Sequence, residues 1–203
     1  MKALVEAGSA GSMHQGPNTA LIVVDVLNAY EHDDADKLVA SVDQALRAMK
    51  QLLQDARERR ILRIYVNDNF DDWTLDRGKL LERATSGPHA RLVEPLAPDD
   101  DVAVVLKGRH SIFWETPLSY MLHQADVGHI VLCGQVTEQC ILYSALDAHV
   151  RHFDVTIARD ACASIHEDLA AAALEMMERN MGARVVDAAD ALDVPAPAAP
   201  RGG

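Results

Sequence analysis

Short apolar runs of strand length alternate along this chain with longer helical stretches, and this alternation limits the folds open to it. Five such runs lie in residues 19–26, 61–66, 101–106, 129–133 and 153–158, and residues 184–186 form a short sixth. Strands that are apolar on both faces are typical of parallel sheets covered by helices. The sequence therefore predicts an α/β fold with a mostly parallel five- or six-stranded sheet and helices on both faces.

The helical stretches follow the runs. Residues 36–59 carry apolar side chains on one face, and residues 166–181 end before Gly182, a typical helix stop. We expect one domain over residues 18–190. Residues 1–17 are predicted to be a flexible N-terminal arm, and residues 191–203 a disordered tail rich in Pro, Ala and Gly.

The composition limits which binding partners and which cellular compartment are expected for this chain. The formal net charge of −12 over 203 residues disfavours nucleic acid and anionic membrane surfaces. No apolar run is long enough to span a membrane, and residues 1–6 lack the apolar core of a signal peptide. Three cysteines cannot all pair within one chain. A cytoplasmic protein with free thiols is expected.

Reactive side chains follow three of the predicted strands. Asp25 ends the first run, Lys107 follows the third, and Cys140 follows the fourth. Because the carboxyl ends of parallel strands lie along one edge, where the sites of such sheets form, we expect these residues to meet. A cysteine nucleophile needs a base and a group that holds negative charge, and Asp25 and Lys107 can supply these two roles.

The segment 134–140 joins a buried strand to a helix over residues 141–146. A cysteine at a helix start faces unpaired backbone N–H groups and the positive end of the helix dipole. Both favour the thiolate, which is the nucleophilic form. The sequence therefore predicts that the Cys140 thiol ionises readily.

Three segments at these strand ends carry a family resemblance. They are Val-Asp-Val-Leu-Asn at 24–28, Lys-Gly-Arg-His-Ser-Ile-Phe at 107–113 and Gly-Gln-Val-Thr-Glu-Gln-Cys at 134–140. In this order they resemble the isochorismatase-like cysteine hydrolase superfamily, which includes nicotinamidases and N-carbamoylsarcosine amidases. The resemblance covers residues 18–187. It implies a Rossmann-like three-layer sandwich and an Asp-Lys-Cys triad at Asp25, Lys107 and Cys140.

The resemblance also implies a mechanism without a cofactor. Asp25 would accept the thiol proton, Cys140 would attack a carbonyl carbon, and water would hydrolyse the resulting thioester. A cis peptide is implied at Gln135–Val136, and the N–H groups of Val136 and Cys140 would form the oxyanion hole. Members of this superfamily usually form dimers or tetramers, so a homodimer or homotetramer is expected.

Two residues near the expected pocket depart from the family pattern. Leu27 stands where many relatives carry glutamine, and Gln135 stands where valine often follows Gly134. The metal site of nicotinamidases has no counterpart, because residues 67–73 contain no histidine. We therefore expect no metal, and nicotinamide is disfavoured as the substrate.

Aromatic side chains gather just after the predicted strand ends. Five of the nine Phe, Trp and Tyr residues do so, namely Tyr30, Phe70, Trp73, Phe113 and Trp114. Aromatic walls suit a flat or partly apolar ligand. These five residues and Gln135 are predicted to bind a small-molecule substrate. Arg109 and His110 closely follow Lys107 and are further candidates for substrate contact.

Three functions stay open at this point. The favoured one is a hydrolase that cleaves an amide-type C–N bond of a small molecule. An isochorismatase-type enol-ether hydrolase does not require the thiol, so the presence of Cys140 favours the amide. A non-catalytic ligand-binding or thiol-sensing protein on the same fold would not need the full set of Asp25, Lys107 and Cys140.

Overall fold

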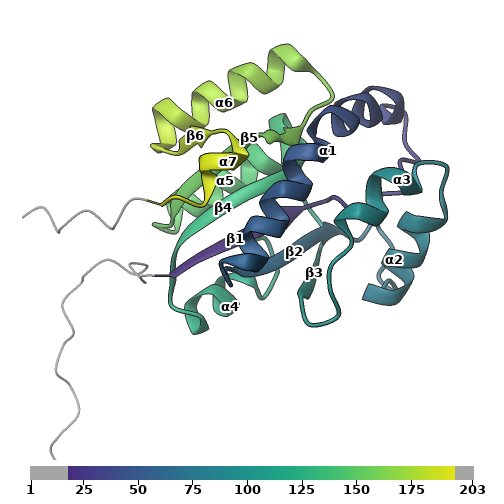
Figure 1. Cartoon of the computed structure of the whole chain (residues 1–203), viewed down its shortest axis with the longest axis horizontal. Helices are drawn as coiled ribbons and strands as arrows, with labels where there is room; N and C mark the ends of the chain where they lie inside the picture. Colours follow the sequence, from purple (N-terminus) through teal and green to yellow (C-terminus); the bar gives the residue numbers. More distant parts are fainter. Residues whose placement is uncertain (1–17, 195–203) are drawn as a thin grey trace, which may run out of the picture.

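A six-stranded parallel sheet forms the centre of the computed structural model, which describes residues 18–194. Its strands lie in the order β3-β2-β1-β4-β5-β6, and every pairing is parallel. They are β1 (Asn18–Val24), β2 (Leu62–Asp68), β3 (Ala103–Lys107), β4 (Val127–Gln135), β5 (Asp154–Ala163) and β6 (Arg184–Val186). The predicted α/β class is confirmed (Figure 1).

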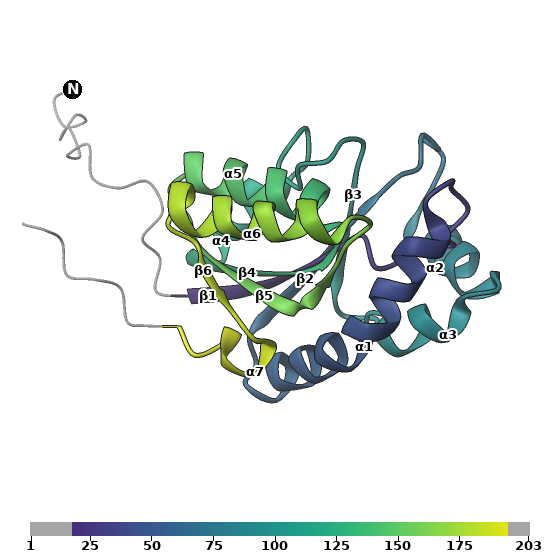
Figure 2. The ribbon, with the colours of Figure 1, turned by 90° about the horizontal axis from the view of Figure 1, so that it is seen from above.

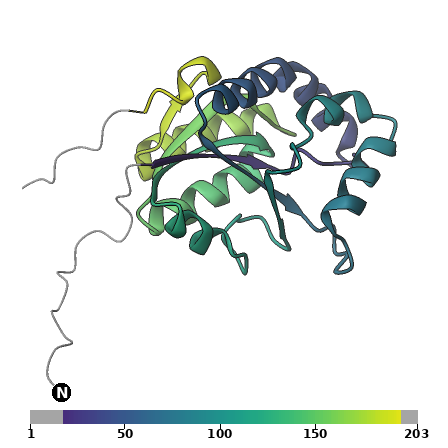
Figure 3. The same ribbon diagram turned by 60° about the horizontal axis from the view of Figure 1, so that its bottom comes forward.

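Helices cover both faces of this sheet and make three layers. They are α1 (Ala35–Glu58), α2 (Arg77–Ser86), α3 (Ala90–Val93), α4 (Leu118–Gln124), α5 (Leu142–Val150), α6 (Glu167–Met181) and α7 (Ala188–Ala191). Helices α1 and α7 lie on one face, and α4, α5 and α6 lie on the other (Figure 2). A third view shows the same separation (Figure 3). None of the helices within residues 18–194 combines the length and apolar character needed to cross a membrane.

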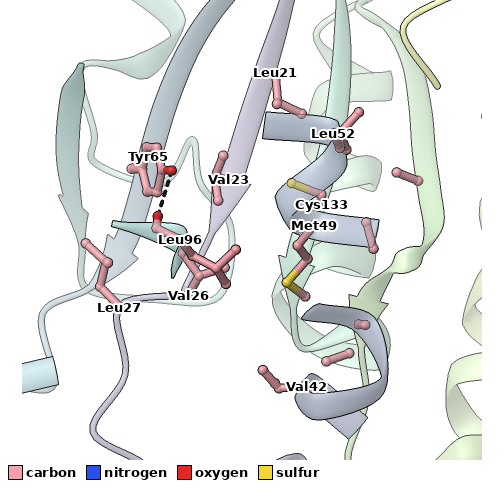
Figure 4. Close-up of a cluster of buried hydrophobic side chains, with 14 of the residues drawn as sticks. Leu21, Val23, Val26, Leu27, Val42, Met49, Leu52, Tyr65, Leu96 and Cys133 are labelled. Carbon is pink, nitrogen blue, oxygen red and sulfur yellow. Dashed lines mark hydrogen bonds between the residues drawn. The ribbon is translucent and has the colours of Figure 1, made fainter. Parts of the chain in front are cut away.

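Strand β1 shows why the apolar runs are continuous. Successive side chains of a strand point to opposite faces of the sheet. Leu21 and Val23 pack in the core on the α1 face, close to Met49 of α1 (Figure 4). Ile22 and Val24 pack in the second core, which includes residues of α4, α5 and α6. Both faces of the strand are therefore buried, as the sequence predicts.

Helices α2 and α3 lie between β2 and β3, where the sequence gives little periodic signal. Only Leu80 and Ala84 are buried in α2, so its apolar stripe is too sparse to recognise. The Asp76 carboxylate accepts a hydrogen bond from the backbone N–H of Lys79 at 2.9 Å and caps the helix. A local cap and tertiary packing define α2 more than its own amphipathicity.

The predicted terminal segments are described only in part. Residues 1–17 and 195–203 lie outside the described residues. Residues 191–194 of the predicted tail are described: α7 ends at Ala191, and the Asp193 carboxylate accepts a hydrogen bond from Arg59 at 2.6 Å.

The side on which the chain adds new strands to the sheet changes between β1 and β4. From β1 the chain continues to β2 and β3 on one side, and the later strands β4, β5 and β6 extend the sheet on the other. Ligands of open α/β sheets bind at the carboxyl ends of the strands beside such a change of side. Asp25 follows β1 and Cys140 follows β4, so both lie at this crevice.

Gly134 lets β4 pass close to β1 just before the crevice, where the pairing with β5 shifts register. Its φ is +119°, and a Cβ atom at this position would lie 2.1 Å from the backbone oxygen of Val24. We expect Gly134→Ala to lower the free energy of unfolding by about 3 kcal/mol or more. Urea denaturation measures this loss. The control is Gly182→Ala, where φ is +68° and no atom lies within 4 Å; it should cost about 1 kcal/mol.

Candidate active site

Lys107 stands at the centre of the crevice. It is the last residue of β3, and its side chain has no exposed surface. Its Nζ atom lies 2.8 Å from Asp25 Oδ2 and donates a hydrogen bond to Cys140 Sγ at 3.4 Å. The structure therefore brings together the three residues that the sequence placed on one sheet edge.

Backbone contacts fix the Asp25 carboxylate. Asp25 follows β1 with a left-handed φ of 55°, and its N–H donates to the carbonyl of Val66 at 3.0 Å. Its Oδ1 atom accepts the backbone N–H of Asp68 at 2.7 Å, which leaves Oδ2 facing Lys107. The Asn67 side chain bonds both the N–H and the C=O of Leu27. These contacts hold the loop after β1 against β2.

Cys140 lies in a π-helical turn, η2 (Thr137–Ile141), that leads directly into α5. The N–H groups of Gln139 and Ile141 both donate to the Val136 carbonyl at 3.1 Å. The peptide bond Gln135–Val136 is cis. The Gln135 side chain donates to the carbonyl of Asp25 at 2.5 Å, so it links the β4 end to the β1 end.

The surroundings of Cys140 contradict the prediction that its thiol ionises readily. Only 8% of the residue is exposed. Burial, followed by the charge of Asp25, raises the pKa of the Cys140 thiol well above its ordinary value, and the Lys107 ammonium offsets this only in part. The prediction was wrong because a helix N-terminus contributes on the order of 1 kcal/mol, whereas burial moves a pKa by up to about 3–5 units.

The two partners of Cys140 are also shifted. Burial raises the pKa of the Asp25 carboxyl, and Lys107 opposes that rise. For Lys107, burial disfavours the ammonium, but the charges of Asp25 and Cys140 outweigh it and raise its pKa. Burial therefore makes both the thiol and the carboxyl weaker acids than usual beside a fixed ammonium. This arrangement suits a proton that passes between Cys140 and Asp25.

Two further side chains contact the site, and only one of them was a candidate from the sequence. Asp68 ends β2 directly opposite Lys107 in the sheet register, and its Oδ2 lies 3.4 Å from Nζ. The strand-end rule that selected Asp25 would also have selected Asp68. His110, a candidate for substrate contact, places Nδ1 3.6 Å from Cys140 Sγ. The site therefore holds a second carboxylate and an imidazole.

Three of the predicted aromatic residues are engaged with the protein itself. The Tyr30 hydroxyl donates to Gln135 Oε1 at 3.4 Å, and burial raises the pKa of Tyr30 to about 12. Phe113 is buried and stacks on Phe153 with centroids 5.7 Å apart. Phe70 lies under the Arg83 guanidinium at 5.1 Å.

The two tryptophans are more exposed than these three residues. Trp73 is 78% exposed and Trp114 is 47% exposed. Both line a cavity of about 110 Å³ that also includes Lys107 and Gly108. The Trp73 ring lies against Gly108, where a Cβ atom would come within 3.0 Å of it. Exposed aromatic rings thus stand beside the end of β3, and neither Asp25 nor Cys140 lines this cavity.

Two other kinds of site were considered within residues 18–194: a large hollow away from the crevice, and a metal site. A hollow of about 1130 Å³ runs along α1, lined by side chains such as Lys50, Arg57 and Tyr65, and none of the crevice residues lines it. In the described residues, no group of three or more His, Cys, Asp or Glu side chains is arranged to hold a metal ion.

Comparisons with known proteins show which family the chain resembles. The family model "Isochorismatase domain" matches residues 19–190. The chain is 30% identical over 166 residues to the uncharacterized isochorismatase family protein YaaI of Bacillus subtilis (strain 168), spanning 82% of this chain and 92% of that protein. It is 28% identical over 161 residues to maleamate amidohydrolase of Pseudomonas putida, spanning 75% and 76%. The solved structure of a cysteine hydrolase from Pseudomonas syringae pv. phaseolicola 1448A matches with a TM-score of 0.69 and 26% identity, covering 85% of this chain and 90% of that one.

Proposed function

This chain belongs to the isochorismatase family of hydrolases, and we propose that it cleaves an amide-type C–N bond of a small molecule through a thioester on Cys140. One observation carries the proposal: the buried Nζ of Lys107 contacts both the Asp25 carboxylate and the Cys140 sulphur. The amidohydrolase among the relatives supports the choice of an amide. Enol-ether hydrolysis would not require a thiol at this point.

In the proposed first half-reaction, Asp25 takes the thiol proton as Cys140 Sγ attacks the carbonyl carbon. Lys107 balances the negative charge, because its Nζ lies 2.8 Å from Asp25 Oδ2 and 3.4 Å from Sγ. The protonated Asp25 then gives its proton to the nitrogen, the C–N bond breaks, and the amine leaves. The raised pKa of both Asp25 and Cys140 keeps this proton within the pair.

In the proposed second half-reaction, water adds to the thioester carbonyl carbon and loses a proton. The C–S bond breaks, the sulphur regains a proton, and a carboxylic acid is released. The backbone N–H groups of Val136 and Cys140 are the proposed donors to the oxyanion in both halves. Losing one such donor typically lowers the rate about 10²–10³-fold.

A panel of small amides tests this function. Release of ammonia or amine identifies substrates, and acid-quenched samples are digested and analysed by mass spectrometry for an acyl group on Cys140. We expect an acyl adduct on Cys140 and none on Cys133, which is fully buried in β4. Turnover of an amide that leaves Cys140 unmodified, and that persists in Cys140→Ala, would contradict the covalent mechanism.

The pH dependence of kcat/KM follows from Asp25. Asp25 must be deprotonated to accept the thiol proton, and burial raises its pKa above the ordinary aspartate value of 3.8. Activity is therefore expected to fall as pH drops through this raised value, so the acid limb lies at higher pH than for an exposed aspartate. The pKa of Lys107 is raised as well, so loss of its charge should cause no alkaline limb below about pH 10. A pH–rate profile of kcat/KM measures both limbs.

The cavity beside Lys107 is the proposed subsite for part of the substrate. Trp73 and Trp114 line it, together with the carboxylates of Asp72 and Glu115. Its volume of about 110 Å³ admits only a small group. The tryptophan rings suit a flat or cationic group, since both stack well on an indole face.

Removing either tryptophan ring is expected to weaken substrate binding more than chemistry. Trp73→Ala and Trp114→Ala should each raise KM about tenfold and leave kcat within about twofold, since roughly 1.4 kcal/mol of contact is lost. Steady-state kinetics measure the split between kcat and KM. The control is Tyr120→Ala, a change at an exposed aromatic on α4 that should alter neither constant. A fall in kcat at constant KM would contradict the subsite.

The remaining expectations about this protein stay predictions. They are the homodimer or homotetramer, the cytoplasmic location, the absence of a cofactor, and substrate contact by Tyr30, Phe70, Phe113 and Gln135.

A further inference from the structure

We propose that His110 is a second proton-transfer residue of this site, which activates the water that hydrolyses the thioester and then returns a proton to Cys140. The inference rests on the proposed function, because it assigns a residue to the second half of that reaction. Its starting point is the 3.6 Å contact between His110 Nδ1 and Cys140 Sγ, the reacting atom.

The sulphur has a buried side and an open side. Lys107 and Asp25 approach it from the protein interior, with side chains that are 0% and 9% exposed. His110 is exposed and contacts the same sulphur. It is therefore the titratable neighbour of Sγ with direct access to bulk water.

The His110 ring is held in place rather than loosely extended into solvent. It lies against the Tyr143 ring, with centroids 5.3 Å apart and planes inclined by 30°. Tyr143 belongs to α5, the helix that directly continues the turn carrying Cys140. The imidazole and the sulphur are thus positioned by neighbouring residues of one helical segment.

The segment after β3 is fixed to α5 as well. The Ser111 hydroxyl donates to Asp147 Oδ2 at 2.6 Å, and the backbone N–H of Ile112 donates to Ser144 Oγ at 3.1 Å. Asp147 and Ser144 both lie on α5. The residues that follow His110 are therefore anchored to the helix that begins next to the nucleophile, which keeps Nδ1 at a set distance from Sγ.

Asp25 is poorly placed to activate the second water. Its Oδ1 accepts the Asp68 N–H at 2.7 Å, and its Oδ2 faces Lys107 at 2.8 Å, both inside the protein. An acyl group on Cys140 would stand between this carboxylate and solvent. Water that reaches the thioester from the exposed side passes His110, whose ring nitrogen can accept and donate a proton.

The proton balance closes with His110 in this role. One water O–H bond breaks, its proton goes to the imidazole, and its oxygen bonds to the thioester carbonyl carbon. The C–S bond then breaks and Cys140 leaves as the thiolate. The imidazolium gives its proton to the sulphur, so the acid is released and both Cys140 and His110 return to their starting forms.

Several charged or titratable groups surround this imidazole and bear on any pH effect. Cys140 faces it from η2 and Tyr143 from α5, and Lys107 and Asp25 lie behind the sulphur. Arg109 precedes it on its own segment and lies over the Trp114 ring at 5.8 Å. Because these groups remain in a His110 variant, a limb lost from the pH profile of that variant belongs to the imidazole.

The test uses 4-nitrophenyl acetate, which acylates a cysteine without needing a proton on its leaving group. The nitrophenolate burst reports acylation, and the steady state reports hydrolysis of the thioester. In His110→Asn, we expect a burst with the rate and amplitude of the wild type. The steady-state rate should fall about 10²-fold, and acetyl-Cys140 should accumulate in the mass spectrum. The steady-state pH profile of the variant should lack the limb that belongs to the imidazole.

Imidazole rescue separates proton transfer from a structural role. Because His110 is exposed, free imidazole can enter the space left in His110→Ala, and it should speed the loss of acetyl from Cys140 at least tenfold. This loss is followed in the mass spectrum after excess ester is removed, because imidazole also hydrolyses 4-nitrophenyl acetate directly. The control is His149→Asn, a change at an exposed histidine of α5 that should leave burst and steady state unchanged.

Two results would overturn the inference while leaving the proposed function intact. One is an equal fall of burst and steady state in His110→Asn, without accumulation of acetyl-Cys140. The other is a lack of rescue by imidazole. A wild-type protein that shows no burst, or a Cys140→Ala variant with full activity on its amide substrate, would instead overturn the proposed function and this inference with it.

Discussion

Replacing Cys140 with alanine is expected to lower kcat/KM for the amide substrate by about 10⁴-fold or more. Loss of a nucleophile of this kind costs up to about 10⁶-fold in well-studied hydrolases. Asp25 and Lys107 would remain, but neither can form the thioester. Because the thiol is small and the change only removes one sulphur atom, the free energy of unfolding should fall by about 1 kcal/mol. Steady-state kinetics measure the fall in kcat/KM, and urea denaturation measures the change in the free energy of unfolding.

The matched control is Cys133→Ala. Cys133 lies in β4, seven positions before Cys140, and is fully buried in the core on the α1 face. Burial raises the pKa of Cys133 to about 12, and its thiol takes no part in the proposed mechanism. Cys133→Ala should lose some stability and keep full activity. Retained activity in Cys140→Ala would instead favour the enol-ether reaction, which proceeds without a thiol.

Replacing Lys107 with methionine is expected to affect both stability and activity. The ammonium is buried between Asp25 and Asp68, at 2.8 Å and 3.4 Å. Removing one partner of a buried ion pair typically costs about 3–5 kcal/mol, because the other charge is left without compensation. We expect the free energy of unfolding, measured by urea denaturation at neutral pH, to fall by this amount.

The same change moves the pH profile. Lys107 opposes the rise in the pKa of Asp25, so in Lys107→Met this pKa should rise further. A group whose folded-state pKa lies above its unfolded value destabilises the folded state as pH rises through that window. The stability deficit of Lys107→Met should therefore shrink as pH falls toward the raised pKa of Asp25, and its residual activity should show an acid limb at higher pH than in the wild type.

A double variant separates charge from packing. Lys107→Met combined with Asp25→Asn removes the uncompensated carboxylate, while Asp68, which is 35% exposed, remains solvated. We expect the double variant to regain most of the lost stability and none of the activity. A double variant as unstable as Lys107→Met alone would mean that packing of the lysine stem, and not its charge, stabilises this part of the fold.

The fold was largely predictable because its strands are buried on both faces. A run such as the one in β1 has no polar side, so it can only belong to a sheet that is covered by two helical layers. The helix α2 was missed because just two of its residues, Leu80 and Ala84, are buried. Two buried residues are too few to show a helical period in the sequence. The helix depends instead on its cap and on packing against other parts of the chain.

The edge on which the candidate site lies was also predictable, but its proton chemistry was not. Parallel strands end on one side, so Asp25, Lys107 and Cys140 were expected to face one crevice from their order in the sequence. Whether the thiol is ionised depends on how much water reaches it, and that depends on elements far apart in the chain. The helix start alone suggested a thiolate, whereas burial holds the Cys140 pKa above its ordinary value.

The sequence by itself thus determined the layers, the parallel sheet and the edge that carries the reactive residues, because apolar periodicity and strand direction are local properties of the chain. Only the tertiary structure decided which groups touch the sulphur. The contacts of Cys140 with Lys107 and His110 join residues that are 33 and 30 positions apart. Such contacts depend on the twist of the sheet and on the packing of α5, and no local pattern encodes either.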